Sequence, residues 1–227
     1  MAGPFRIVFI LYPQLTQLDF TGPYEVLWRI PGVEVTLASK QGGSLTAESG
    51  LCFSGLAKLA DVAGADLIMV PGGPGQSAAM LDREFMAEVK RLGEGARYVT
   101  SVCTGSLILA AAGLLAGKRA GAHWAYRELL PRFGVVADPA RVVRDGGAIT
   151  GGGVTAGIDI ALTIAAEIAG EDVAKTIQLA IEYAPAPPFE SGRPELAEPS
   201  IVEAVGRLFS GFAAQREKAI AEITGRE

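Results

Sequence analysis

Cys103 is the residue of this chain best placed to do chemistry. The string Val99-Thr100-Ser101-Val102-Cys103-Thr104-Gly105-Ser106 predicts an apolar strand that ends at the cysteine and a helix that follows it, from Thr104 to about Leu115. A thiol at the positive end of a helix is expected to lose its proton more readily than an ordinary thiol. The same order of elements is found in the nucleophile elbow, a sharp turn that exposes a reactive side chain. We therefore expect Cys103 to be a nucleophile, while a free cysteine can also serve as a small buried hydrophobic residue.

Asp19 is the acid most suited to work with this thiol. It follows the first predicted strand and lies between the apolar residues Leu18 and Phe20. A carboxyl group that is desolvated by such neighbours has a raised pKa and can carry a proton in catalysis. The position also suits the N-terminal cap of a helix. The two roles are compatible, so the sequence leaves both open.

Two backbone N–H groups are candidates for stabilising negative charge during the reaction. Gly72 and Gly73 follow a short apolar strand in Pro71-Gly72-Gly73-Pro74-Gly75, and glycine lets the backbone approach a bound group closely. Thr104 directly follows the cysteine. We expect the N–H groups of Gly73 and Thr104 to form an oxyanion hole. The glycine-rich segment lacks the lysine and the spacing of a phosphate-binding loop.

His123 is the only histidine of the chain. It could pair with Cys103 in a catalytic dyad, but a histidine beside Trp124 at the start of a helix is more often a structural residue, and Asp19 is the better proton carrier. One histidine and two separated cysteines do not provide a metal-ligand spacing, so no metal is expected. The second cysteine, Cys52, has alternating apolar neighbours and is interpreted as a core position of a strand.

Strand-like and helical segments alternate along the chain, as in α/β proteins. The expected strands are Phe5–Tyr12, Val33–Ala38, a hairpin within Leu45–Leu56, Asp66–Val70, Ala96–Val102, and an alternating segment Val135–Gly153 that turns at Asp145-Gly146-Gly147. The expected helices are Asp19–Ile30, Leu81–Leu92, Thr104–Leu115, His123–Phe133, Thr155–Ala169 and Ser200–Ile223, the last with an apolar stripe of Ile201, Val205, Leu208 and Phe212. The apolar strands predict a mostly parallel sheet with helices on both faces, and a ligand crevice at the carboxyl ends of its strands.

Composition narrows the class of protein. The chain has 227 residues, of which 49% are hydrophobic and 20% charged, which is ample for the core of one large domain. The net charge of −5 and the lack of a basic cluster argue against a nucleic-acid partner. The apolar run near the N-terminus is too short to span a membrane.

Cysteine usage and a proline-rich break add two further expectations. Two cysteines in different contexts, without a secretory signal, predict no disulfide and a reducing, cytoplasmic location. The break at Pro185-Ala186-Pro187-Pro188 separates an α/β domain, residues 1–190, from a C-terminal helical extension, residues 191–227. We expect this extension to pack on the same domain or on its dimer partner.

The order of Asp19, Pro71-Gly72-Gly73 and Ser101-Val102-Cys103-Thr104-Gly105-Ser106 resembles the ThiJ/PfpI superfamily, over residues from Phe5 to about Phe189. The resemblance implies a flavodoxin-like three-layer sandwich with a mostly parallel central sheet, of the class I glutamine amidotransferase-like type. It also implies a cysteine at the elbow, an acid from the loop after the first strand, and a homodimer.

Longer strings are similar to the isocyanide hydratases within this superfamily. They are Gln17-Leu18-Asp19-Phe20-Thr21-Gly22-Pro23, Tyr98 to Ser106, His123-Trp124-Ala125-Tyr126, Thr150-Gly151-Gly152-Gly153 and Glu182 to Phe189. Most members that resemble glyoxalases and deglycases carry glutamate at the position of Asp19, and amidase-like and peptidase-like members generally carry histidine at the position of Thr104. A related set of transcription regulators has an added helix-turn-helix region, for which the segment after Phe189 is too short.

The resemblance implies hydration of an isocyanide to an N-substituted formamide. In this hypothesis Cys103 adds to the terminal carbon to form a thioimidate, Asp19 moves protons, and water releases the product without any cofactor. The substrate pocket is expected to include Leu18, Phe20, Gly72, His123 and Val154. Two alternatives remain: a glyoxalase or deglycase acting on a reactive aldehyde, and a redox-sensing cysteine protein.

Overall fold

A central sheet of eight strands forms the framework in the computed structural model of the chain, which describes residues 3–225. Its strand order is β3-β4-β2-β1-β5-β6-β10-β9. These strands are β1 (Phe5–Leu11), β2 (Val33–Ser39), β3 (Gly43–Thr46), β4 (Cys52–Lys58), β5 (Leu67–Val70), β6 (Tyr98–Ser101), β9 (Val142–Asp145) and β10 (Ala148–Gly151). A separate short parallel pair joins β7 (Arg119–Ala120) and β8 (Val136–Ala137).

The middle of the sheet is parallel and the two edges are antiparallel. Strand β1 pairs in parallel with β2 and β5, and β6 pairs in parallel with β5 and β10. At the edges, β3 runs antiparallel to β4 and β9 antiparallel to β10. All four residues of β5 are fully buried, because this strand lies between two neighbours and is covered on both faces. The mostly parallel sheet and the turn between β9 and β10 confirm the sequence-based expectation.

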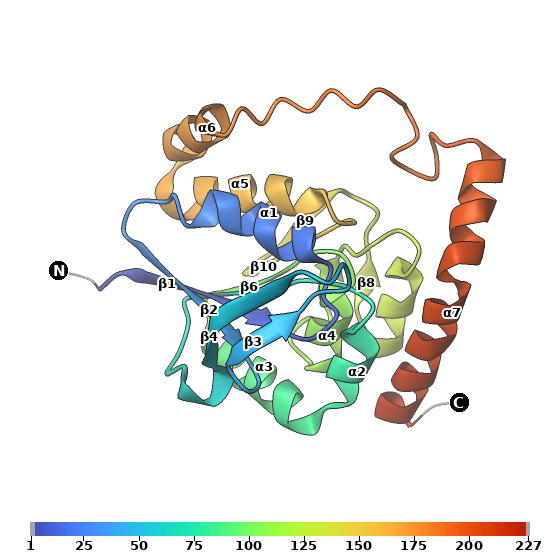
Figure 1. Ribbon diagram of the computed structural model, residues 1–227, viewed down its shortest axis with the longest axis horizontal. Helices are drawn as coiled ribbons and strands as arrows, with labels where there is room; N and C mark the ends of the chain where they lie inside the picture. Colours follow the sequence, from blue (N-terminus) through green and yellow to red (C-terminus); the bar gives the residue numbers. More distant parts are fainter. Residues whose placement is uncertain (1–2, 226–227) are drawn as a thin grey trace.

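Helices cover both faces of the sheet (Figure 1). On one face α1 packs against α5, and α6 packs against α5; on the other face lie α2, α3 and α4. The helical segments are α1 (Gln17–Leu27), α2 (Gln76–Leu81), α3 (Arg83–Gly95), α4 (Gly105–Ala111), α5 (Ala156–Ala169), α6 (Glu171–Ala180), α7 (Pro199–Thr224) and the 3₁₀ segments η1 (Leu59–Asp61) and η2 (Arg127–Phe133). The three layers confirm the expected α/β sandwich.

Helix α1, which carries Asp19, packs closely against α5, where the Pro23 ring lies on Gly157. A Cβ on Gly157 of α5 would lie 2.9 Å from Cδ of Pro23 in α1. Only glycine allows this spacing, and the buried side of α5 is otherwise formed by alanine and isoleucine. The pairing fixes the height of α1 above the sheet and so the position of Asp19.

The four central strands β1, β5, β6 and β10 end at the same edge of the sheet, because they are parallel and adjacent. The loops that follow them are residues 12–16, 71–75, 102–104 and 152–155. This arrangement brings together segments from the first strand and from the last parallel strand of the chain. The edge is the usual ligand crevice of open α/β sheets.

Helix α7 lies against α2 and η2, at the end of a long linker that crosses from α6 (Figure 1). Its buried side consists of Phe209, Phe212, Arg216, Ala219 and Ile220, all wholly or partly buried. The predicted stripe was wrong in part. Ile201 and Leu208 are 48% and 70% exposed, because the contact surface of α7 is rotated relative to the most apolar side of the helix.

Several other local expectations were also wrong. Cys52 is exposed rather than in the core, because β4 lies next to the edge strand β3. The predicted helix His123–Phe133 is a 3₁₀ segment that starts only at Arg127 and contains Pro131. Helix α4 ends at Ala111, and the short helices α2 and α6 were not expected at all.

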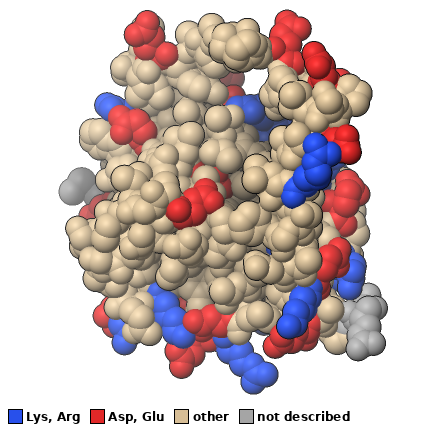
Figure 2. Space-filling view, turned by 45° about the vertical axis from the view of Figure 1, so that its right-hand side comes forward, with Lys and Arg blue, Asp and Glu red and all other residues tan. Residues whose placement is uncertain are grey.

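Charged side chains are dispersed over the surface. Figure 2 shows basic and acidic residues interspersed around the edge of one face, whose centre is largely uncharged. None of the helices within residues 3–225 combines the length and the hydropathy of a membrane span. Residues 1–2 and 226–227, which belong to the two units expected from the sequence, lie outside the described residues.

Candidate active site

Cys103 lies on the tight turn that the sequence predicts, between β6 and α4. Its φ of 58° is in the left-handed region, which costs a residue other than glycine on the order of 1 kcal/mol. Its N–H donates to the carbonyl of Gly152 at 2.9 Å, which ties the turn to the loop after β10. Gly105 allows the turn to close, because a Cβ there would lie 2.2 Å from the carbonyl oxygen of Val70. The strained conformation is thus held by its surroundings.

Asp19 is fully buried at the same edge of the sheet. Its Oδ2 accepts a hydrogen bond of 2.8 Å from the N–H of Gly72, and its Oδ1 has no hydrogen-bond partner among residues 3–225. Burial raises the pKa of this carboxyl from 3.8 to about 7. The helix-cap interpretation is wrong, since the N-cap of α1 is Thr16 and the Asp19 carboxyl reaches across to another loop.

The thiol of Cys103 and the carboxyl of Asp19 interact, and each influences the ionisation of the other. Burial and the nearby Asp19 carboxylate raise the pKa of the Cys103 thiol well above its ordinary value. The N–H groups of Thr104 and Val154 act in the opposite direction, as donors to the sulfur. The sequence predicted a lowered thiol pKa, and this was wrong, because burial and a like charge outweigh the start of a helix only seven residues long. The pair holds one negative charge more readily than two.

The glycine loop after β5 holds the two catalytic candidates in place rather than facing an open cavity. A Cβ on Gly72 would lie 2.5 Å from the Thr104 nitrogen and 2.8 Å from Oδ2 of Asp19, so only glycine fits. The N–H of Gly73 donates to the Thr104 hydroxyl at 3.0 Å and is therefore not free for an oxyanion. The donors at the sulfur are the N–H groups of Thr104 and Val154, and sequence reasoning missed the second because it treated Val154 only as a pocket side chain.

His123 is close to Cys103 through its backbone, not through its ring. Its N–H donates to the Cys103 carbonyl at 3.3 Å. The ring packs against Trp124, Tyr126 and Phe209, and its Nδ1 accepts from the N–H of Ala125. Burial and, to a smaller extent, the positive charge of Arg216 lower its pKa to about 4. His123 is therefore neutral at physiological pH, and no hydrogen bond joins its ring to the thiol.

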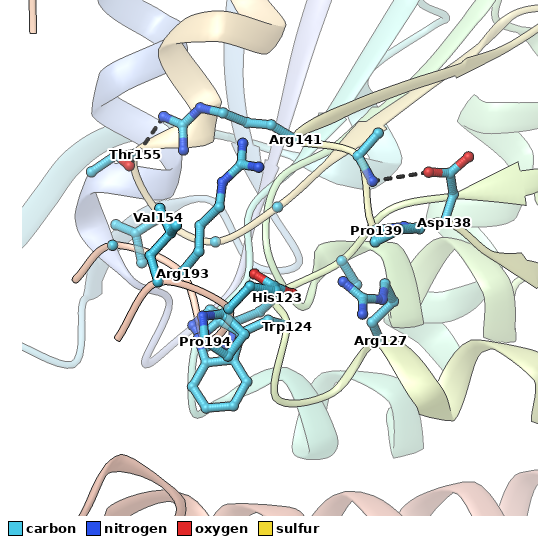
Figure 3. Close-up of a pocket in the computed structure, with 17 residues that line it drawn as sticks. His123, Trp124, Arg127, Asp138, Pro139, Arg141, Val154, Thr155, Arg193 and Pro194 are labelled. Atoms are coloured by element: carbon cyan, nitrogen blue, oxygen red, sulfur yellow. Dashed lines mark hydrogen bonds between the residues drawn. The ribbon is translucent and has the colours of Figure 1, made fainter. Parts of the chain in front are cut away.

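A cavity of about 660 Å³ adjoins the site on the side of Val154. Figure 3 shows Val154 and Thr155 on one side of it, His123 and Trp124 at its base, and Arg127 on the opposite side. Of the expected pocket residues, His123 and Val154 line this cavity, whereas Leu18, Phe20 and Gly72 do not. Phe20 is 2% exposed and packs in the core against the aromatic rings of Phe9, Tyr24 and Phe53.

Cys103 itself does not line the cavity and is 6% exposed. Gly152 and Val154 line the cavity, and both interact with Cys103 through their backbones. Among residues 3–225, the structure has no group of three or more histidine, cysteine, aspartate or glutamate side chains that could hold a metal ion. The site is thus a buried thiol and a buried carboxyl beside a cavity.

Two further residues at the site were missed by sequence reasoning. The hydroxyl of Tyr12 donates to the carbonyl of Pro71 at 2.9 Å and faces the same pair of ionisable groups. Arg216 of α7 is 3% exposed, and its charge interacts with Cys103. The signal for Arg216 was its spacing of four and seven residues from Phe212 and Phe209, which places all three on one side of the helix.

Comparison with known proteins adds independent information. The model of the DJ-1/PfpI family matches residues 5–167. The isonitrile hydratase of Pseudomonas putida is 48% identical over 221 residues, which cover 97% of this chain and 95% of that protein. The HTH-type transcriptional regulator CdhR of Pseudomonas aeruginosa is 29% identical over 73% of this chain, and the match covers 51% of the regulator. A crystal structure of a ThiJ/PfpI family protein from Pseudomonas syringae superimposes with a TM-score of 0.93 at 36% identity, covering 96% of this chain and 91% of that one.

Proposed function

The chain belongs to the DJ-1/PfpI family, and we propose that it is an isonitrile hydratase, an enzyme that adds water to an isocyanide to give an N-substituted formamide. The observation that carries this proposal is the 48% identity to the Pseudomonas putida isonitrile hydratase over 97% of the chain. The buried Cys103 and Asp19 supply a nucleophile and a proton carrier, which are the two groups that the reaction needs.

In the first step the thiol of Cys103 adds across the terminal carbon of the isocyanide. The S–H bond breaks, and new S–C and C–H bonds form at that carbon to give a thioimidate, R–N=CH–S–Cys103. Asp19 takes the proton from Sγ and passes it to the carbon. A pKa of about 7 suits this task, because a group that both accepts and donates a proton works best when its pKa is near the working pH.

In the second step water adds to the carbon of the thioimidate, and the nitrogen gains a proton. The C–S bond then breaks, the formamide R–NH–CHO leaves, and the thiol regains its proton. The N–H groups of Thr104 and Val154 stabilise negative charge on the sulfur as it attacks and as it leaves. The two steps together consume one water and regenerate the enzyme, with no change of oxidation state at the protein and no cofactor.

The substituent of the isocyanide occupies the cavity lined by His123, Trp124 and Val154 in this proposal. Because Cys103 does not line this cavity whereas residues 152–155 do, the small linear isocyano group would reach the sulfur after a shift of this segment. Gly152 and Gly153 make such a shift possible, since glycine tolerates changes of backbone angles.

A direct assay tests the function. Purified protein is incubated with alkyl, aryl and carboxylate-bearing isocyanides, and formamide is measured by NMR. Turnover that disappears in Cys103→Ala is the expected result. Absence of formamide from the whole panel, together with release of lactate from methylglyoxal, would replace the hydratase by a glyoxalase or deglycase. Oxidation of Cys103 without any turnover would favour a redox sensor.

Assembly and location complete the proposal. We propose a homodimer, because apolar side chains on α6, the linker and α7 are exposed, among them Leu179, Phe189, Leu196 and Leu208. Light scattering of the purified protein tests this, and a monomer at micromolar concentration would contradict it.

A reducing, cytoplasmic location suits an enzyme that depends on a free thiol. Residues 1–190 would then form the α/β domain and residues 191–227 an extension that closes one side of it.

A further inference from the structure

A buried cation of helix α7 lies beside the active site. The Nε of Arg216 donates to Oε1 of Gln76 at 2.9 Å, and its Nη2 donates to the carbonyl of Gly73 at 3.2 Å. The guanidinium carbon is 4.0 Å from the centre of the Tyr126 ring. Arg216 is 3% exposed, so a side chain from the C-terminal end of the sequence forms part of the wall behind the glycine loop.

This guanidinium has no carboxylate partner in the part of the chain that the structure describes. No aspartate or glutamate oxygen of residues 3–225 lies within 4.0 Å of it, and its hydrogen-bond acceptors are two neutral oxygens. Two other arginines of the chain do have carboxylate partners. Arg207 of the same helix pairs with Glu203, and Arg141 pairs with Asp159. A buried charge without a counter-ion is unfavourable, so its presence indicates that an anion forms nearby.

Cys103 becomes an anion in the proposed reaction, and its charge interacts with that of Arg216. Hydrogen bonds also connect the two residues. Gly73 accepts from Arg216 with its carbonyl and donates with its N–H to the hydroxyl of Thr104, the residue after the nucleophile. On the other side, the N–H of Tyr126 donates to the carbonyl of His123, whose own N–H donates to the carbonyl of Cys103.

We propose that Arg216 is a positioning residue that supplies the counter-charge of the Cys103–Asp19 pair, so that α7 completes the electrostatics of the active site. The positive charge offsets part of the repulsion from Asp19 and of the unfavourable burial that oppose ionisation of the sulfur. The inference rests on Cys103 as the nucleophile of the proposed function, and it does not depend on which substrate is used.

Other charged and titratable groups also face the pair and belong in the same balance. From the surrounding loops and elements they are Tyr12, Glu48 and Tyr126, and the ring of His123 interacts with Arg216. Tyr12 and Tyr126 have raised pKa values and His123 a lowered one, so all three are neutral near pH 7. Glu48 is the remaining anion. Arg216 is therefore the one cation among the groups that the structure places around the pair within residues 3–225.

The test measures how fast iodoacetamide alkylates Cys103 as a function of pH, in the Cys52→Ser background so that only one thiol reacts. In Arg216→Met the midpoint of the pH profile is expected to rise by about one unit, which lowers the alkylation rate at pH 7 about ten-fold. Arg216→Lys keeps the charge and is expected to remain within about three-fold of the parent rate. With substrate, Arg216→Met should lower kcat while KM changes little.

Two controls separate charge from packing. Gln76→Glu leaves Arg216 in place but puts a carboxylate against it, and is expected to raise the midpoint as Arg216→Met does. Arg207→Met removes an exposed, paired arginine from the same helix and should leave the profile unchanged. The proposal is overturned if folded Arg216→Met retains the parent midpoint, or if Arg216→Met and Arg216→Lys shift it equally. If Arg216→Met does not fold, an unshifted profile in Gln76→Glu overturns it instead.

Failure of the proposed function gives a different result. A parent protein that forms no formamide, but in which the midpoint still depends on the charge at position 216, would refute the hydratase and leave the role of Arg216 intact.

Discussion

Replacing Asp19 by asparagine should make the protein more stable at alkaline pH and almost inactive. The Asp19 carboxyl is fully buried, one of its oxygens has no hydrogen-bond partner among the described residues, and burial raises its pKa to about 7. Ionised Asp19 therefore destabilises the folded state. The amide introduced by Asp19→Asn would keep an acceptor for the N–H of Gly72 and would carry no charge at any pH.

The size of the effect follows from the pKa. In the unfolded chain the carboxyl titrates near 3.8, and in the folded protein near 7. Between these values the folded state binds more protons than the unfolded state, so the free energy of unfolding falls as the pH rises through this window. A difference of about three pH units corresponds to about 4 kcal/mol, of which about 3 kcal/mol falls between pH 4.5 and pH 8. Above pH 8 no further loss from Asp19 is expected.

Urea unfolding of the parent and of Asp19→Asn at pH 4.5 and pH 8 measures this effect. Contributions from groups that do not interact with Asp19 are common to both proteins, and the constant effect of the new amide cancels when the two pH values are compared. The stability of the variant relative to the parent should improve by about 3 kcal/mol between pH 4.5 and pH 8. A difference that does not depend on pH would falsify the claim that the carboxyl is buried without compensation. Isocyanide turnover of the variant should fall at least 100-fold, as for loss of a general acid–base group.

Three other predictions concern activity and packing. Cys103→Ser should abolish formamide formation, while Cys52→Ser, at an exposed position, should keep the parent rate. Equal losses of activity in the two variants in the NMR assay would refute the assignment of Cys103 as the nucleophile. In the parent, kcat/KM should rise about ten-fold per pH unit below pH 7 and level off above it, because the base is the ionised Asp19 carboxylate. A flat profile from pH 5 to pH 8 would assign the proton transfer to another group. The same rise of kcat/KM with pH in Asp19→Asn would do so as well. Gly72→Ala should lower the free energy of unfolding by about 1–3 kcal/mol, because its Cβ would lie 2.5 Å from the backbone nitrogen of Thr104. Gly95→Ala is the control, since its Cβ would meet no atom within 4 Å. Equal thermal midpoints for the two variants would show that the loop of Gly72 accommodates the methyl group without strain.

Local patterns were sufficient to predict most of the sheet. The segment Leu67–Val70 is apolar at every position, and such a strand must be covered on both faces. The turn between β9 and β10 follows from Asp145-Gly146-Gly147, which favours a reversal of the chain. Helices α2 and α6 were not predicted, because α2 is only six residues long and α6 is separated from α5 by Gly170 alone.

Exposure of single side chains was harder to predict than the elements that carry them. Cys52 has apolar neighbours in the sequence, but its strand pairs with the short edge strand and leaves the thiol exposed. On α7 the apolar residues Ile201 and Leu208 point to solvent, while Arg216 is buried. The side of a helix that is buried depends on the surface that receives it, and that surface is built from α2 and η2.

The sequence by itself determined that Cys103 and Asp19 lie at the same edge of the sheet. The strand, cysteine and glycine order placed Cys103 on an elbow, and the apolar neighbours of Asp19 indicated that its carboxyl is desolvated. These are properties of a short segment and its own periodicity. Only the tertiary structure decided how the residues are charged and paired, because desolvation and charge interactions sum over segments that are distant in sequence. Packing of the loops raised the thiol pKa, gave the N–H of Gly73 to the Thr104 hydroxyl, and brought Arg216 against the site.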